Sequence, residues 1–274
     1  MKELIEEYFE RNKDLMIEDI AKLVRIKSDR QEAKEGKPFG EGPAEVLAVA
    51  LETASKMGFR TCNYDNYVGA IDLNDHERKL DILAHLDVVP AGNGWSITEP
   101  FEPFIRDGRI YGRGTADDKG PAVAALYAMK AVKDLNIPLK TGARLILGTD
   151  EECGSSDIRY YYGVETEAPM TFSPDTGFPV VNIEKGGLQG SFASEFEESN
   201  TTPGVSSLRS GVKSNVVPGD SIAIIEGMEL YKIEGYCNAV SESTGVLFEL
   251  STSGNITTVK AKGIQVHAAT PGKG

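Results

Sequence analysis

The sequence predicts an α/β fold in which a largely parallel sheet is flanked by helices and is followed by a smaller α+β part. Three observations support this prediction. Short apolar segments alternate with amphipathic helical segments as far as MTFSPD, which is typical of a parallel sheet covered on both faces. Several of these apolar segments end in acidic residues or histidine. From about Ile183 the chain becomes strand-rich, which indicates a second domain.

Helical segments open the chain. Apolar residues recur at intervals of three and four near the N-terminus, which predicts one or two amphipathic helices from Leu4, Ile5, Tyr8, Phe9, Leu15, Met16, Ile20 and Leu23. Another helix is expected to begin near Pro43, a residue favoured in a first helical turn, and to end at Gly58.

Strands follow these helices. They are expected at FRTCNY (59–64), VGAIDL (68–73) and LDILAH (80–85), with a turn at NDHER before the last of them. GRIYGRGTADDKG reads as a short strand and a glycine-rich loop, and Pro121 lies near the start of a helix over 121–135. ARLILGTDEE is an apolar strand that runs into acids, a short helix surrounds SSDIRYYYG, and MTFSPD is a further strand with an acid at its end.

A change of texture marks the predicted domain boundary. The later segments GGLQGSFASEFE, DSIAIIEG, GVLFELS and ITTVKAKG are strand-rich, with at most one helix between them. We therefore expect one domain over residues 1–185 and a second over 186–274.

Composition excludes several classes of protein. The net charge of -13 disfavours nucleic acid as a partner, and no cluster of basic residues offers a local exception. No apolar run approaches the ~20 residues that span a bilayer, so we expect no membrane partner. The N-terminus lacks the apolar core of a signal peptide. Cys62, Cys153 and Cys237 are few and widely spaced, as reduced thiols are, and a cytoplasmic protein is expected.

Ionisable residues follow the predicted strands. Taken alone, each group has an ordinary explanation: a hydrogen-bonded loop pair, a helix start that complements the helix dipole, or a turn. Taken together they meet at one place, because open α/β sheets bind ligands at the carboxyl edge of their strands. The residues are His85 and Asp87, Glu151 and Glu152, Asp175, and, in the loop before the long helix, Asp117 and Asp118.

Converging carboxylates indicate a metal site. They repel one another unless protons or cations relieve the repulsion. A set of histidine nitrogen and carboxylate oxygen suits zinc, with manganese or cobalt as alternatives. Two such ions can activate a water molecule and polarise a carbonyl group. The rival sites fail: GRGTADDKG fits neither common phosphate-binding motif, and no G-x-S-x-G elbow is present.

Five motifs in order, HLDVVP, GWSITEPFEPFIRDGRIYGRGTADDKG, GTDEECGS, FSPD and GIQVHAATP, resemble the M20 family of zinc peptidases, particularly its Xaa-His dipeptidase-like branch. The resemblance implies a zinc-peptidase catalytic domain over 1–185 and the first part of a lid domain over 186–274. It also implies the metal ligands. His85 and Asp175 would bind one zinc, Glu152 would bind a second, and Asp117 would bridge the two.

The resemblance implies further roles. Asp87 would hold the imidazole of His85, and Glu151 would be the general base that passes a proton from water to the leaving amine. Asp118 would cap or orient the loop. In the lid, Asn215 and His267 match residues that contact the substrate or the oxyanion. Each has a plainer alternative, since Asn215 could make a turn and His267 could be an edge-strand histidine.

The chain departs from the family in length. Members are considerably longer, and their additional segment supplies a histidine for the second zinc and an arginine for the substrate carboxylate. The sequence therefore resembles a family member that ends within the lid, with sheet edges open to self-association. The expected function is hydrolysis of dipeptides by water activated between two zinc ions. The alternatives are hydrolysis of N-acyl amino acids, and a metal-binding chain that is inactive alone.

Overall fold

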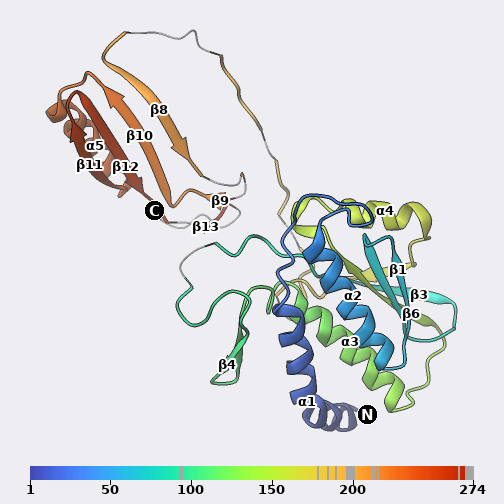
Figure 1. Ribbon diagram of the computed structural model, residues 1–274. Helices are drawn as coiled ribbons and strands as arrows, with labels where there is room; N and C mark the ends of the chain where they lie inside the picture. The colour runs from blue at the N-terminus through green and yellow to red at the C-terminus, as the bar shows by residue number, and fades with distance from the viewer. Residues whose placement is uncertain are drawn as a thin grey trace. The chain divides into compact units, whose positions relative to one another are not determined.

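The computed structural model describes residues 1–92, 95–177, 179–183, 185–188, 190–195, 201–211, 214, 216–264 and 266–268, without the side chain of His267. The chain divides into two compact units, Met1–Val181 and Asn182–Gly274, each of which is described by itself (Figure 1).

A five-stranded sheet lies at the centre of the first unit. Its order is β1 (Arg60–Tyr64), β2 (Val68–Asp72), β6 (Gly142–Gly148), β3 (Arg78–His85) and β7 (Met170–Phe172). β3 pairs in parallel with both β6 and β7, whereas β2 pairs antiparallel with β1 and β6. The α/β class with flanking helices is confirmed, and the sheet is mixed. β1 and β2 are antiparallel because Asp65 and Asn66, both at positive φ, join them by a tight turn.

Helices cover both faces of this sheet. α1 (Lys2–Val24), α2 (Glu41–Lys56) and α3 (Lys119–Asp134) pack on one face around a core that includes Leu47, Ile71 and Leu145. α4 (Ser156–Val164) covers the other face, where Tyr161 packs against Ile146. Successive residues of β6 therefore enter opposite cores, which explains its uninterrupted apolar run.

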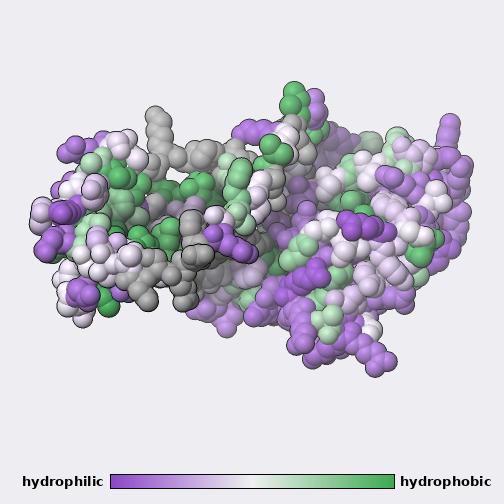
Figure 2. All heavy atoms as spheres, turned by 90° about the horizontal axis from the view of Figure 1, so that it is seen from above, coloured by the Kyte–Doolittle hydropathy of each residue, from purple (hydrophilic) through white to green (hydrophobic). Residues whose placement is uncertain are grey.

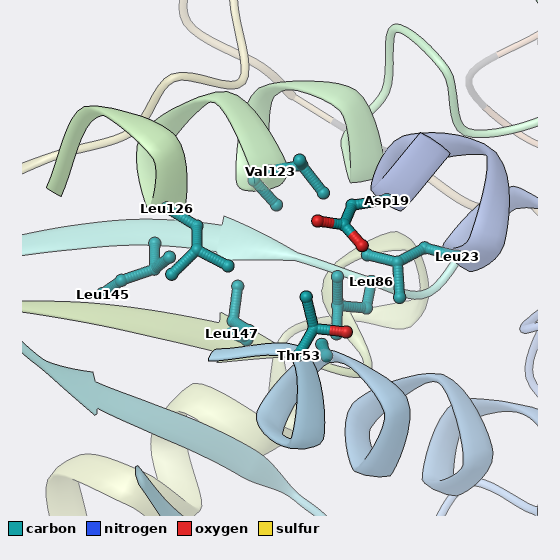
Figure 3. Close-up of a pocket in the computed structure, with 10 residues that line it drawn as sticks. Asp19, Leu23, Thr53, Leu86, Val123, Leu126, Leu145 and Leu147 are labelled. Carbon is teal, nitrogen blue, oxygen red and sulfur yellow. The ribbon is translucent and has the colours of Figure 1, made fainter. Parts of the chain in front are cut away.

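A cavity of about 10 Å³ lies in the larger core, among apolar side chains such as Leu126 and Leu147 (Figure 3). Its polar neighbours have partners: Asp19 accepts a hydrogen bond from the Tyr127 hydroxyl at 2.8 Å, and Thr53 accepts one from Lys22 at 2.9 Å. The space would barely hold one water molecule. It is a packing gap and not a ligand site.

A hairpin of β4 (Phe104–Arg106) and β5 (Arg109–Tyr111) leads from the sheet toward the loop before α3 (Figure 1). Its turn residues, Asp107 and Gly108, both have positive φ. The hairpin matters because the loop that follows it carries Asp117.

The second unit is an antiparallel sheet with one helix. The sheet order is β11 (Leu247–Ser253), β12 (Ile256–Lys262), β10 (Asp220–Glu226) and β8 (Gly204–Ser210), and β9 (Val216–Val217) pairs separately with β13 (Val266–His267). α5 (Leu230–Thr244) contributes the buried Ile233. Figure 2 shows hydrophobic side chains at the surface of this unit, whose exposed large apolar residues include Val205, Leu208, Tyr231, Tyr236 and Leu247.

One sequence expectation for this unit was wrong, and one strand was not foreseen. GGLQGSFASEFE was expected to contribute strands, but none forms among its described residues. Its apolar side chains Leu188 and Phe192 are almost fully exposed. Conversely, β8 was not expected, because GVSSLRS lacks alternating apolar residues; its pairing with β10 makes it a strand. In the part of the chain that the structure describes, no helix is long and apolar enough to cross a membrane.

Candidate metal centre

Three strands bring their ends to one edge of the first sheet. β3 ends at His85, which lies opposite Gly148 at the end of the parallel strand β6. The chain then enters a single 3-10 turn, Glu151–Cys153. On the other side of β3, β7 ends at Phe172, shortly before Asp175. Parallel pairing therefore places these side chains together, as expected for a sheet edge that binds ligands.

The His85 imidazole is the centre of the cluster. His85 is 3% exposed, and its Nε2 is buried without a hydrogen-bond partner. Nε2 lies 3.1 Å from Asp117 Oδ1, 3.3 Å from Asp175 Oδ2 and 3.8 Å from Glu151 Oε2. Burial opposes a charged imidazole, but the carboxylates of Asp117, Asp175 and Asp87 outweigh it and raise the pKa of His85. A neutral imidazole facing these carboxylates would instead use Nε2 to bind a cation.

The donor set fits a divalent metal. Ligand atoms of His85, Asp117 and Asp175 all lie within 4.8 Å of one another. Ligands of a tetrahedral zinc are separated by roughly 3.3 Å, given bond lengths near 2 Å. The distances from Nε2 to the two aspartates match that separation. Among the described residues, Glu152 is not part of this cluster.

Asp87 joins two parts of the site. It is almost completely buried, and its Oδ1 lies 3.3 Å from His85 Nδ1. The same carboxylate accepts hydrogen bonds from the backbone N–H groups of Glu151 at 3.1 Å and Glu152 at 3.0 Å. The backbone carbonyl of Asp87 lies 3.1 Å from the same Nδ1. Asp87 therefore holds the imidazole through its carbonyl and its carboxylate, and the carboxylate also holds the turn that carries the two glutamates.

The two aspartates before α3 differ in environment. Asp118 is fully buried and accepts a hydrogen bond from the backbone N–H of His85 at 3.0 Å. Burial raises the pKa of Asp118 to about 7. The side chain of Asp117 is largely exposed, and its pKa is lowered, first by His85 and also by the positive charge of Arg113. Asp117 is thus the aspartate available to a ligand.

The two glutamates lie at the rim of the cluster and are half-buried. Burial is the main cause that raises the pKa of both Glu151 and Glu152. Asp175 and Asp87 raise the pKa of Glu151 further, and Asp117 does so for Glu152. The crowding of carboxylates thus shifts both groups toward neutrality when no cation is present.

Sequence reasoning missed the groups that support this edge. Asp150, fully buried, accepts hydrogen bonds from Arg30 Nη1 and from the Ser156 hydroxyl, each at 2.5 Å. Lys119, also fully buried, donates to the carbonyls of Leu23 and Ile26 at 3.0 and 2.8 Å. The acidic segment TDEE could have indicated Asp150, and the segment DDK could have indicated Lys119. No sequence signal indicates Arg30.

The structure does not describe the side chains of the two residues expected in the lid. Asn215 lies outside the described residues. The backbone of His267 pairs with Val216 in the β9–β13 ribbon, and the side chain of His267 lies outside the description.

Comparisons with known proteins agree with the motifs. The model of Peptidase family M20/M25/M40 matches residues 82–264. The chain is 38% identical over 268 residues to "Putative dipeptidase YtjP" of Bacillus subtilis (strain 168), covering 96% of this chain and 58% of that protein. It is 37% identical over 235 residues to the Beta-Ala-Xaa dipeptidase of Lactobacillus delbrueckii subsp. lactis, covering 83% and 49%. The chain thus spans about half the length of these curated relatives.

Solved structures share the fold. Human carnosine dipeptidase 1 is 24% identical with a TM-score of 0.52, over 63% of this chain and 41% of that one. An M20 family metallo-carboxypeptidase from Sulfolobus solfataricus is 17% identical with a TM-score of 0.50, over 90% and 70%. The resemblance drawn from the five motifs is confirmed, and the chain belongs to peptidase family M20/M25/M40.

Proposed function

We propose that the protein is a metal-dependent dipeptidase, with residues 1–185 as catalytic domain and 186–274 as the first part of a lid. The observation that carries this proposal is the buried Nε2 of His85, which has no hydrogen-bond partner and faces the carboxylates of Asp117 and Asp175. The dipeptidase names of curated relatives, of which this chain spans about half the length, support the substrate class.

The proposed ligands are those at the sheet edge. His85 and Asp175 would hold one ion, Glu152 a second, and Asp117 both, with zinc as the metal and manganese or cobalt as alternatives. Divalent ions bound there would supply Lewis-acid activation of water and of the scissile carbonyl. Asp87 orients His85 by its contact with Nδ1.

Glu151 is the proposed general base. Its half-buried carboxylate lies 3.8 Å from His85 Nε2, and its raised pKa suits a group that takes a proton and returns it. Glu151 takes a proton from the attacking water and gives it to the leaving amine. Asp87 fixes the turn below it through the Glu151 N–H group. In the lid, Asn215 and His267 are proposed to contact the substrate.

Replacement of Glu151 by Gln tests the mechanism. The variant should lose hydrolysis of a dipeptide panel while it retains bound zinc, because the amide cannot accept a proton but keeps the shape of the side chain. Glu45→Gln, on the exposed face of α2, is the matched control. Unchanged turnover in Glu151→Gln would exclude this residue as the base. Faster hydrolysis of N-acetyl amino acids than of dipeptides would favour the amidohydrolase alternative.

Zinc content per chain, measured by elemental mass spectrometry after dialysis, tests the two-metal site. Two zinc ions are expected if Glu152 and Asp117 complete the second site. One ion would restrict binding to His85, Asp117 and Asp175, and none would contradict the metal proposal. A chain that retains zinc and hydrolyses nothing in the panel would favour the inactive metal-binding alternative.

We propose the cytoplasm as the compartment and exposed sheet edges as sites of self-association. Cys62 and Cys237 are free, and Cys62 and Cys153 are exposed, as a reducing compartment allows. β8 and β11 are the outer strands of the second sheet. Fractionation of cells and light scattering of the purified protein test the two statements.

A further inference from the structure

A second hollow lies in the first unit. None of the candidate metal ligands lines it, but its residues lie close in sequence to Asp117. Its volume is about 450 Å³, and its walls come from the loop that contains Trp95, from β5 and from the loop Gly112–Thr115. Trp95, Ile97, Ile110 and Tyr111 make it partly apolar. Thr115, also in its lining, lies two positions before Asp117. The hollow and the candidate metal ligand therefore share one loop.

Arg113 is the only charged residue among the described residues that line this hollow. Its guanidinium carbon lies 5.5 Å from the centre of the Trp95 ring, and Nη2 donates to the carbonyl of Ala91 at 3.3 Å. Nε is buried without a hydrogen-bond partner. Among the described residues, no carboxylate lies within ion-pair distance of Arg113, although its positive charge lowers the pKa of Asp117. An arginine that packs on an aromatic ring, makes no direct ion pair and keeps a buried Nε without a partner is unusual in a chain with 42 acidic residues.

Two hydroxyl groups of the hollow are already engaged as donors, which leaves those of Ser96 and Tyr111 beside Arg113. The Thr98 hydroxyl donates to the carbonyl of Glu102 at 2.6 Å, and the Thr115 hydroxyl donates to that of Gly112 at 3.0 Å. Both hydroxyl protons are therefore engaged. The guanidinium offers planar, paired N–H groups, which suit a carboxylate.

We propose that this hollow is a carboxylate subsite, in which Arg113 binds a carboxylate of the peptide substrate. The inference rests on the proposed peptide hydrolysis and adds the position at which the substrate is held. The carboxylate comes either from an acidic side chain or from the peptide's C-terminus. Arg113 would be a specificity residue, since a substrate without that group gains nothing from it.

Trp95 provides a direct measurement, because it is the only tryptophan of the chain and packs on Arg113. The protein is stripped of metal, so that no turnover occurs, and is titrated at constant ionic strength with Ala-Glu, Ala-Gln and Ala-Gln amide. A saturable change in Trp95 fluorescence is expected with Ala-Glu and none with the amide. Binding of Ala-Gln as tight as that of Ala-Glu would identify the C-terminal carboxylate as the source, and much weaker binding would identify the side chain.

Variants assign the binding to Arg113. Arg113→Gln should raise the Kd for Ala-Glu by on the order of 10- to 100-fold, as the loss of a charged hydrogen-bonding partner does. Arg113→Lys, which keeps the charge but not the planar fork, should lie between. Arg106→Gln is the matched control, because Arg106 lies on the neighbouring β4 over Tyr111 and outside the hollow. Thermal unfolding of each variant excludes a folding defect.

Two results would overturn the subsite. Equal binding of Ala-Glu and Ala-Gln amide by the unmodified protein would show that no carboxylate is recognised, whatever the variants do. An unchanged Kd in a folded Arg113→Gln variant would place the binding elsewhere. Because the titration needs neither metal nor turnover, its failure is separate from failure of Glu151→Gln.

Discussion

At the residue scale, Asp87 has two structural tasks where the sequence indicated one. The motif HLD predicted a contact with His85, and the structure places Asp87 Oδ1 3.3 Å from His85 Nδ1. The hydrogen bonds from the Glu151 and Glu152 backbone were not predicted, because they join positions far apart in the chain. Loss of this one carboxylate should therefore disturb the imidazole and the glutamates together.

Asp87→Asn tests this dual role. The amide keeps the size of the side chain but loses its charge and one of its acceptor oxygens, so zinc affinity and kcat/KM should each fall by about 10- to 100-fold. Chelator competition and dipeptide hydrolysis measure the two quantities. Asp107→Asn, at the exposed hairpin turn, should change neither. A large loss of kcat/KM with unchanged zinc affinity would restrict Asp87 to the glutamate turn.

The predictable residues of the site share one property: each follows an apolar strand directly or lies in a short motif. His85, Asp87 and Asp175 were predicted to lie together from strand ends alone, and the structure brings them together. Arg30 could not be predicted, since only the folded chain brings it to Asp150, 120 positions away. The contact depends on the packing of the whole unit, which no local pattern encodes.

At the element scale, the start of α3 is packed directly against the loop that carries Asp117. A Cβ atom built on Gly120 would lie 2.0 Å from the carbonyl oxygen of Thr115. A backbone atom cannot move aside as a flexible side chain can, so the first turn of the helix needs glycine at this position if the loop is to remain in place.

Gly120→Ala should therefore destabilise the protein by roughly 1–3 kcal/mol and weaken zinc binding, because the loop must move. Gly163→Ala is the matched control in α4, where a Cβ atom would meet nothing within 4 Å. The control should stabilise the helix by up to about 1 kcal/mol. Urea unfolding and chelator competition provide the measurements, and equal effects of the two substitutions would contradict the packing argument.

Asp72 links three strands and makes stability depend on pH. Its carboxylate on β2 accepts hydrogen bonds from Arg144 on β6 at 2.7 and 3.1 Å and from Arg60 on β1 at 3.1 and 3.0 Å. Burial raises the pKa of Asp72, but the two arginines outweigh it and lower the pKa below its usual value. The folded state thus binds fewer protons than the unfolded state at this group.

The stabilisation from Asp72 is therefore fully present above the unfolded pKa of about 3.9 and is lost as the pH falls through the folded value. Asp72→Asn should lower the free energy of unfolding at pH 7 by roughly 1–3 kcal/mol, and the difference from the unmodified protein should shrink below about pH 4. Asp75→Asn, an exposed partner of Arg60, should have little effect. Urea titrations over this pH range would contradict the assignment if the difference stayed constant.

At the scale of the whole molecule, the two units have cores of different size. The first buries an extensive apolar cluster on one face of its sheet and a smaller one on the other. In the described part of the second unit, the buried residues are few and include Ile233, Thr257 and Val259. Sequence patterning predicted the helices and parallel strands of the first unit well, because these elements have a buried face, with the exception of the exposed strand β7. It predicted the second unit less well, because strands such as β8 expose apolar and polar residues alike.

This difference in burial predicts two unfolding transitions. Burial of apolar surface is the main source of stability, and a small unit buries a smaller fraction of its surface. The second unit should therefore unfold at lower urea concentration than the first.

Two spectroscopic probes distinguish the units. Trp95 belongs to the first unit, so its fluorescence reports that unit alone, whereas far-ultraviolet circular dichroism reports both. Circular dichroism should lose part of its signal before the fluorescence changes, and zinc should shift only the later transition upward, since its proposed ligands lie in the first unit. Coincident transitions by both probes would mean that the units fold as one cooperative structure.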